Sequence, residues 1–141
     1  MSCLCLNLRS ASEDLETLWV FVEENALGAG LDEGQVKRIE LALEEAAVNI
    51  INHAYGGQGG KLELHCTPVP GGLELRLVDE GPPFNPLEAP GPKAVTDIAS
   101  QRIGGLGIHL MRNMADALRY RREKGRNVLT LCFFRKSGAA P

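Results

Sequence analysis

The chain has 141 residues, 44% of them apolar and 23% charged, which predicts one globular domain with a real core. Its formal net charge of -3 argues against nucleic acid as the main partner. We find neither a signal-peptide pattern nor an apolar run of 18 residues, so we do not expect insertion into a membrane. The cysteines (Cys3, Cys5, Cys66 and Cys132) lie in apolar strand patterns without zinc-site spacing, apart from the weak Cys-x-Cys at the start, so we expect reduced, cytoplasmic thiols packed as small hydrophobic groups.

The first half of the chain alternates between strand and helix patterns. Residues 3–9 have period-two hydrophobicity and predict a strand. Ser10 and Glu13 form a capping box that opens a first helix, which ends at Gly28-Ala-Gly30. Asp32 and Gln35 form a second capping box, and the helix that follows stops at Gly56-Gly57. We expect the first helix to bury Leu15, Leu18, Trp19, Val22 and Ala26.

The second half predicts two hairpins separated by a long polar segment. Residues 61–67 and 73–79 alternate and are joined by a turn at 68–72. Residues 87–103 have little apolar content, and we interpret them as a mobile lid. A short helix then carries Met111, and a closing hairpin turns near Lys124-Gly125. Its last strand, 128–134, is apolar on both faces and therefore central.

This order of elements predicts an α+β fold: a two-layer sandwich with helices packed on one face of a mixed, largely antiparallel sheet. Residues 1–136 form the single domain and 137–141 a frayed tail. Arg112–Lys136 holds eight Lys or Arg against two acidic residues. A solvated edge hairpin explains this surplus as well as a docking face for an acidic partner does.

Three polar clusters lie at the ends of the predicted elements. Glu45 and Asn49 are one turn apart on the long helix, with Cβ atoms about 5–6 Å from each other. That spacing suits a carboxylate that activates a hydroxyl beside a metal ion held by an amide oxygen. Asp79 followed by Gly81 can accept a hydrogen bond from an adenine amino group where the backbone approaches the ring. Gly104-Gly-Leu-Gly107 precedes a helix, where free amides attract phosphate.

Taken together, these motifs resemble those of the GHKL (Bergerat-fold) ATPases over roughly Leu4 to Phe134. Glu45-x-x-x-Asn49 with His53 resembles the N box, Asp79-Glu-Gly-Pro-Pro-Phe84 the G1 box, and 104–107 the G2 box. The Pro-Pro-Phe form of the G1 box is most similar to the RsbW-type anti-sigma-factor serine/threonine kinases. Sensor histidine kinases differ in this box and add a phospho-acceptor helix, for which this chain has no room.

The resemblance implies a role for each matching residue. Asn49 would supply an amide oxygen to Mg²⁺, and Glu45 would be the catalytic general base that accepts the proton of a serine hydroxyl. Asp79 would bind the adenine amino group of ATP, with Gly81 giving clearance. Thr130 in the last strand would contact adenine through a water molecule.

The phosphates would be held by Gly104, Gly105 and Gly107. Glu44 is a rival for the base, but it points about 100° away from Asn49 around the helix, so Glu45 is preferred. His53 is a structural histidine or a phosphate contact.

The resemblance therefore implies an ATP-dependent, Mg²⁺-dependent protein-serine/threonine kinase that phosphorylates a small antagonist (STAS-like) protein. It leaves room for a sigma factor as a second partner and for a homodimer. For Lys93 and Arg102 in the predicted lid there are two readings: they contact the γ-phosphate, or they are ordinary solvent-exposed charges. The alternative is a nucleotide-responsive binding module that sequesters a sigma factor or another regulator without phosphoryl transfer, and a stand-alone ATPase is a third, weaker reading.

Overall fold

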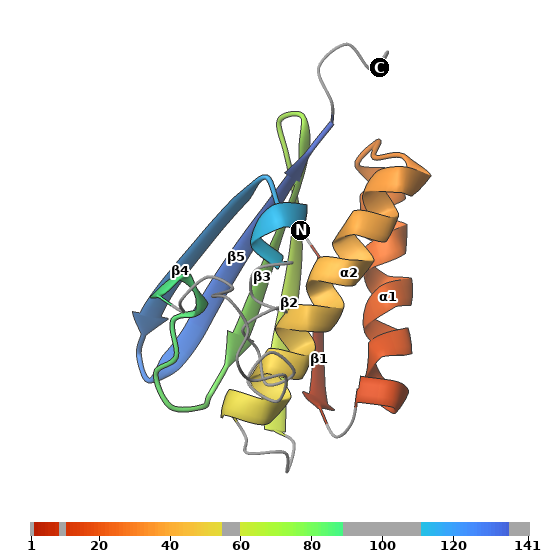
Figure 1. The fold of residues 1–141 in the computed structure, drawn as a ribbon. Helices are drawn as coiled ribbons and strands as arrows, with labels where there is room; N and C mark the ends of the chain where they lie inside the picture. The colour runs from red at the N-terminus through yellow and green to blue at the C-terminus, as the bar shows by residue number, and fades with distance from the viewer. Residues whose placement is uncertain (1, 9–10, 55–59, 89–110, 136–141) are drawn as a thin grey trace, which may run out of the picture.

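The computed structural model describes residues 2–8, 11–54, 60–88 and 111–135, and shows two layers (Figure 1). Two long helices pack on one face of an antiparallel sheet, so the predicted α+β sandwich is confirmed. The helices are α1 (Ala11–Gly28) and α2 (Glu33–Asn49), and the strands are β1 (Ser2–Leu8), β2 (Gly60–Val69), β3 (Gly72–Asp79), β4 (Ala117–Glu123) and β5 (Arg126–Phe134).

The order of strands across the sheet is β1-β2-β3-β5-β4, and each neighbouring pair is antiparallel. Strand β5 therefore lies between β3 and β4, as its apolar composition predicted, and residues 127–133 are all buried. Strand β4 is an edge strand with exposed arginines, which agrees with a solvated edge hairpin. Pairing β3 with β5 brings together residues that are about fifty positions apart, and this pairing builds the candidate site.

Helix α1 buries four of the five residues that its periodicity predicted, and the fifth, Trp19, is half-buried. Leu15, Leu18, Val22 and Ala26 of α1 are buried, and α1 ends where Gly30 adopts φ +86°. Asp32 caps α2: its carboxylate accepts a hydrogen bond from the backbone N–H of Gln35, and the Gln35 side chain accepts one from Asp32 N–H. The second capping box is therefore confirmed. The first capping box and the predicted helix end at Gly56-Gly57 rest on Ser10, the side chain of Glu13 and those two glycines, which lie outside the described part of the structure.

The end of the second helix differs from the sequence prediction. Regular α-helix stops at Asn49, and Ile50–Ala54 forms a π-helical turn. The N–H of Ile50 still bonds the carbonyls of Ala46 and Ala47, as is common at the end of an α-helix, and the π-helical turn begins at this residue. Such turns widen the helix, and this one begins directly after Asn49, where the candidate site lies.

The two hairpin turns follow the predicted chemistry. Strand β2 runs to Val69, two residues further than expected, and Pro70-Gly71 makes the turn with Gly71 at φ +79°. Lys124 and Gly125 both have positive φ, as a tight hairpin with right-handed strand twist requires.

The cysteines divide into two classes, and the expectation for two of them is wrong. Cys66 and Cys132 are buried, but Cys3 and Cys5 are exposed. The reason is the pleat of β1: its leucines turn toward the helices, so the alternate cysteines emerge on the face of the sheet that α1 and α2 do not cover. None of the helices in the described part of the chain has the length and hydropathy needed to cross a membrane.

Candidate functional site

A cavity is lined by residues from the last turn of α2, the end of β3 and the start of β5, together with residues of the segment that follows β3. Its empty volume is about 340 Å³, part of it open to solvent. Polar groups are few among the lining residues, which are Ala46, Asn49, Ile50, Asp79, Phe84, Pro86, Tyr120, Asn127 and Leu129. A mostly apolar cleft with a few convergent polar groups is the usual form of a small-molecule site.

Asp79 is the buried carboxylate of the cavity, at the last position of β3 and 5% exposed. Its Oδ1 accepts hydrogen bonds from the N–H of Gly81 and from Nδ2 of Asn127, each at 2.9 Å. Burial raises the pKa of Asp79 above its usual value, although these two hydrogen bonds and the charge of Arg122 act in the opposite direction. Both hydrogen bonds from described residues end on one oxygen, which leaves Oδ2 for a ligand.

Asn127 is the polar centre of the site, and sequence reasoning missed it. It is 4% exposed and lies directly opposite Asp79 in the β3–β5 register. Besides Asp79, its Nδ2 donates to the carbonyl of Pro82 at 2.9 Å. Its Oδ1 accepts from the N–H of Phe84 at 3.3 Å and from the hydroxyl of Tyr120. One side chain therefore fixes the end of β3, the segment after it and the edge strand.

Asn49 reaches the same cavity from the last position of α2. The residue is 8% exposed, and its Oδ1 is buried without a hydrogen-bond partner among the described residues. An unsatisfied buried oxygen costs roughly 1–3 kcal/mol. Amide oxygens are ligands that Mg²⁺ accepts, so the residue fits the metal that its motif implies.

Glu45 lies one helical turn before Asn49 and is half-buried. Desolvation raises the pKa of Glu45, and the neighbouring Glu44 carboxylate adds to the shift. Glu45 does not line the cavity itself but stands at its α2 side. A carboxylate with a raised pKa, one helical turn from the buried amide of Asn49, can act as a general base.

The structure corrects the placement of Thr130. Leu129 and Leu131 point into the core, so Thr130 points to the opposite face of the sheet. There it lines a different hollow together with Arg119 and Arg121. Thr130 is therefore not placed to contact a ligand bound beside Asp79. The residue of β5 that is placed to do so is Asn127.

Several other predicted site residues fall outside the described residues. This group contains Gly104, Gly105 and Gly107 and the side chain of His53. It also contains most of the segment predicted as a lid, including Lys93 and Arg102. The first residues of that segment are described: Pro86–Glu88 form a short 3₁₀ turn. Arg112 donates hydrogen bonds to the carbonyls of Pro86 and Leu87 and holds this turn against the short helix at residues 111–114.

The fold and the site define a nucleotide-binding domain of ATPase type. The family described as histidine kinase-like ATPase domain matches residues 8–133, and the chain belongs to this family. The resemblance to the GHKL ATPases found in the motifs is thus confirmed.

Curated relatives agree with this assignment. The chain is 32% identical over 94 residues to the serine/threonine-protein kinase BtrW of Bordetella bronchiseptica, which covers 66% of each chain. It is 30% identical over 107 residues to the serine-protein kinase RsbW of Listeria monocytogenes, covering 72% of this chain and 68% of the relative. The chain thus spans about two thirds of the length of these relatives.

A solved structure supports the fold alone. The histidine kinase AdeS of Acinetobacter baumannii superposes with a TM-score of 0.50 over 95% of this chain and 68% of its own, at 16% identity.

Proposed function

We propose that this chain is an ATP-dependent protein kinase of the anti-sigma-factor type, which transfers the γ-phosphoryl group to a serine of a small STAS-like antagonist protein. The observation that carries the proposal is the orphaned Oδ1 of Asn49, which shares one cavity with the buried carboxylate of Asp79. The names of the relatives BtrW and RsbW support a serine or threonine as the acceptor.

The nucleotide would bind with its base at the sheet and its phosphates toward α2. Oδ2 of Asp79 would accept a hydrogen bond from the adenine amino group, while Asn127 holds Oδ1 and fixes the carboxylate. The amide oxygen of Asn49 would hold a Mg²⁺ ion, which neutralises phosphate charge when bound. Gly104, Gly105 and Gly107 remain proposed phosphate contacts on the resemblance of their motif.

Glu45 would act on the incoming serine rather than on the nucleotide. Its carboxylate would accept the proton of the serine hydroxyl as the serine oxygen forms its bond to the γ-phosphorus and the bond to the β–γ bridging oxygen breaks. The products are phosphoserine and ADP, and the proton remains on Glu45. The raised pKa of Glu45 makes it a stronger base than an ordinary carboxylate, which favours this transfer.

The partners of the reaction are part of the same proposal. The resemblance of the motifs to RsbW-type anti-sigma-factor kinases suggests an antagonist protein as substrate and a sigma factor as a second partner, with a homodimer as the working unit. A nucleotide-responsive binding module without phosphoryl transfer is the competing outcome, and the following experiment separates the two.

The test compares Glu45→Ala with Glu44→Ala, a matched change at the adjacent position. ATP and Mg²⁺ binding is measured by calorimetry, and phosphoserine formation on a purified STAS-like antagonist protein is measured with labelled ATP. Glu45→Ala should bind nucleotide as the wild type does and lose about 10²–10⁴-fold in kcat, because a positioned base contributes that much. Glu44→Ala should keep transfer within about tenfold.

Two results would contradict the proposal. Wild-type transfer by Glu45→Ala would remove the assigned base. A wild-type protein that binds ATP but phosphorylates no antagonist would leave the binding module as the function.

A further inference from the structure

The face of the sheet that the helices leave uncovered carries a group of metal-ligand side chains on β1 and β2. Cys3 pairs directly with His65, and Cys5 pairs directly with Glu63, in the antiparallel register of the two strands. Residues two apart on a strand share a face, so all four side chains project on the same side. The pairing of β1 with β2 brings these side chains close together, although more than fifty residues separate the two strands in the chain.

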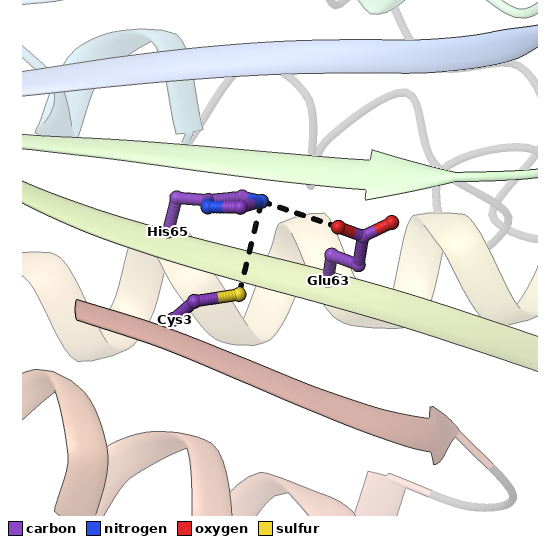
Figure 2. A group of neighbouring side chains, drawn as sticks. All are labelled: Cys3, Glu63 and His65. Carbon is purple, nitrogen blue, oxygen red and sulfur yellow. Dashed lines mark hydrogen bonds and ion pairs between the residues drawn. The ribbon is translucent and has the colours of Figure 1, made fainter. Parts of the chain in front are cut away.

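The side chains of Cys3, Glu63 and His65 point toward one another (Figure 2). The Sγ of Cys3 is 3.9 Å from Nε2 of His65, and the same nitrogen is 3.4 Å from Oε1 of Glu63. The donor atoms of Cys3, Glu63 and His65 all lie within 4.8 Å of one another. Cys5 supplies the next donor, with its Sγ 3.8 Å from the Sγ of Cys3.

These distances are close to the edges of a tetrahedral zinc site. Zinc–sulfur bonds of about 2.3 Å and zinc–nitrogen or zinc–oxygen bonds of about 2.0–2.2 Å give edges of about 3.8 Å (S–S), 3.6 Å (S–N) and 3.4 Å (N–O). The separations of 3.8, 3.9 and 3.4 Å lie within a few tenths of an ångström of these edges. Cys5 lies outside the group whose donor atoms are within 4.8 Å of one another, so its side chain would have to turn toward His65 and Glu63 to complete the site. Mixed thiolate, imidazole and carboxylate ligands favour zinc among the common divalent ions.

The surroundings of the group hold the ligands in place. Arg126 of β5 donates to Oε2 of Glu63 at 2.9 Å, which leaves Oε1 turned toward His65. The Nε2 of His65 is the ring nitrogen that faces Cys3 and Glu63, while its Nδ1 is buried without a partner among the described residues. Two thiolates and one carboxylate would balance the charge of a divalent ion together with the guanidinium.

We propose that Cys3, His65 and Glu63 bind a zinc ion, with Cys5 as the fourth ligand, at a structural site on the outer face of the sheet. The ion would join β1, an edge strand paired only with β2, to the rest of the sheet. The site lies on the opposite face from the cavity of Asn49 and Asp79, so it is independent of nucleotide binding.

Proton release accompanies binding at such a site. Each cysteine that binds the ion gives up its thiol proton. The thiolate is the form that binds zinc. Zinc affinity should therefore increase as the pH is raised through neutrality.

The experiment uses the untagged full chain, without nucleotide and in a phosphine reductant, which keeps Cys3 and Cys5 from forming a disulfide. Zn²⁺ is titrated in competition with a chromophoric chelator. The wild type should bind one equivalent, and Cys3→Ser and His65→Gln should each weaken binding at least about 100-fold, since loss of an outer-shell partner alone costs 10–100-fold. Co²⁺ in place of Zn²⁺ should give a thiolate charge-transfer band that Cys3→Ser reduces.

Matched controls lie on the same face of the sheet. Cys132→Ser removes a buried thiol outside the group, and Glu74→Gln removes a carboxylate that pairs with Arg119 instead. Both should keep wild-type zinc affinity. Zinc should also protect Cys3 and Cys5, but not Cys132, from alkylation read by peptide mass. A wild type that cannot compete with the chelator, or equal affinity in Cys3→Ser, His65→Gln and the wild type, would overturn the proposal.

Discussion

Replacing Asp79 by asparagine separates the ligand-binding role of this side chain from its structural role. The variant keeps the shape of the side chain, and its amide oxygen can accept the hydrogen bonds that Oδ1 now accepts from Gly81 and Asn127. Its NH₂ group then takes the place of Oδ2 and faces the adenine amino group, so two donors meet. One buried unpaired donor costs roughly 1–3 kcal/mol. ATP affinity should therefore fall about 5- to 150-fold.

The same substitution should not destabilise the fold at neutral pH. Burial raises the pKa of Asp79 in the folded protein, which means that the folded state disfavours the charged form. Because the pKa of Asp79 is higher in the folded protein than in the unfolded chain, protonated Asp79 contributes to the free energy of unfolding. This contribution is fully present below the unfolded pKa of about 3.9 and is lost as the pH rises through the folded pKa. At pH 7 Asp79→Asn should thus be as stable as the wild type or more stable, and acidification should stabilise the wild type relative to the variant.

Calorimetric titration with ATP and Mg²⁺ gives the affinity, and thermal unfolding at neutral and acid pH gives the stability. Wild-type ATP affinity in Asp79→Asn would refute the assignment of the adenine contact. A large fall in the melting temperature of Asp79→Asn at pH 7 would instead show that the Asp79 side chain stabilises the fold.

Three further changes test other parts of the account. Glu44→Gln removes the second cause of the raised pKa of Glu45, so the acid limb of the kcat profile should move to lower pH; an unmoved limb would argue against Glu45 as the base. Asn127→Ala should lower the free energy of unfolding by roughly 2–4 kcal/mol in denaturant titration, because several buried partners lose their hydrogen bonds, and a loss below about 1 kcal/mol would contradict its central role. Gly72→Ala places a Cβ 2.1 Å from a backbone oxygen of β5 and should cost roughly 1–3 kcal/mol, whereas Gly28→Ala meets nothing within 4 Å and should be neutral or slightly stabilising.

The sequence contained enough to predict the architecture and half of the cavity. Capping boxes, period-two strands and turn glycines are local signals, and they placed α2, the hairpins and the central position of β5 correctly. Asn49 and Asp79 were also found, because each lies at the end of an element with a recognisable pattern. The structure brings both to one cavity.

Asn127 could not be found in the same way, because its role depends on the register between β3 and β5. That register joins residues 48 positions apart and is not visible in either strand alone. The apolar residues on both faces of β5 also hide which side chains face the helices, so the strand pattern could not test the adenine contact that the resemblance implied for Thr130. The exposed cysteines of β1 are different: their alternation with Leu4, Leu6 and Leu8 was a signal that could have placed them opposite the core, but we expected them to be packed as small hydrophobic groups.

The central claim is that the nucleotide binds between Asn49 and Asp79, with its metal ion at the α2 side. Nuclear magnetic resonance with Mn²⁺ and ATP in place of Mg²⁺ and ATP tests this directly, because a paramagnetic ion broadens nearby signals. The side-chain amides of Asn49 and Asn127 should broaden first. The turn at Gly71, at the far end of β3 and roughly 23 Å away along the strand, should keep sharp signals. Broadening at that turn with sharp Asn49 and Asn127 signals would contradict the account.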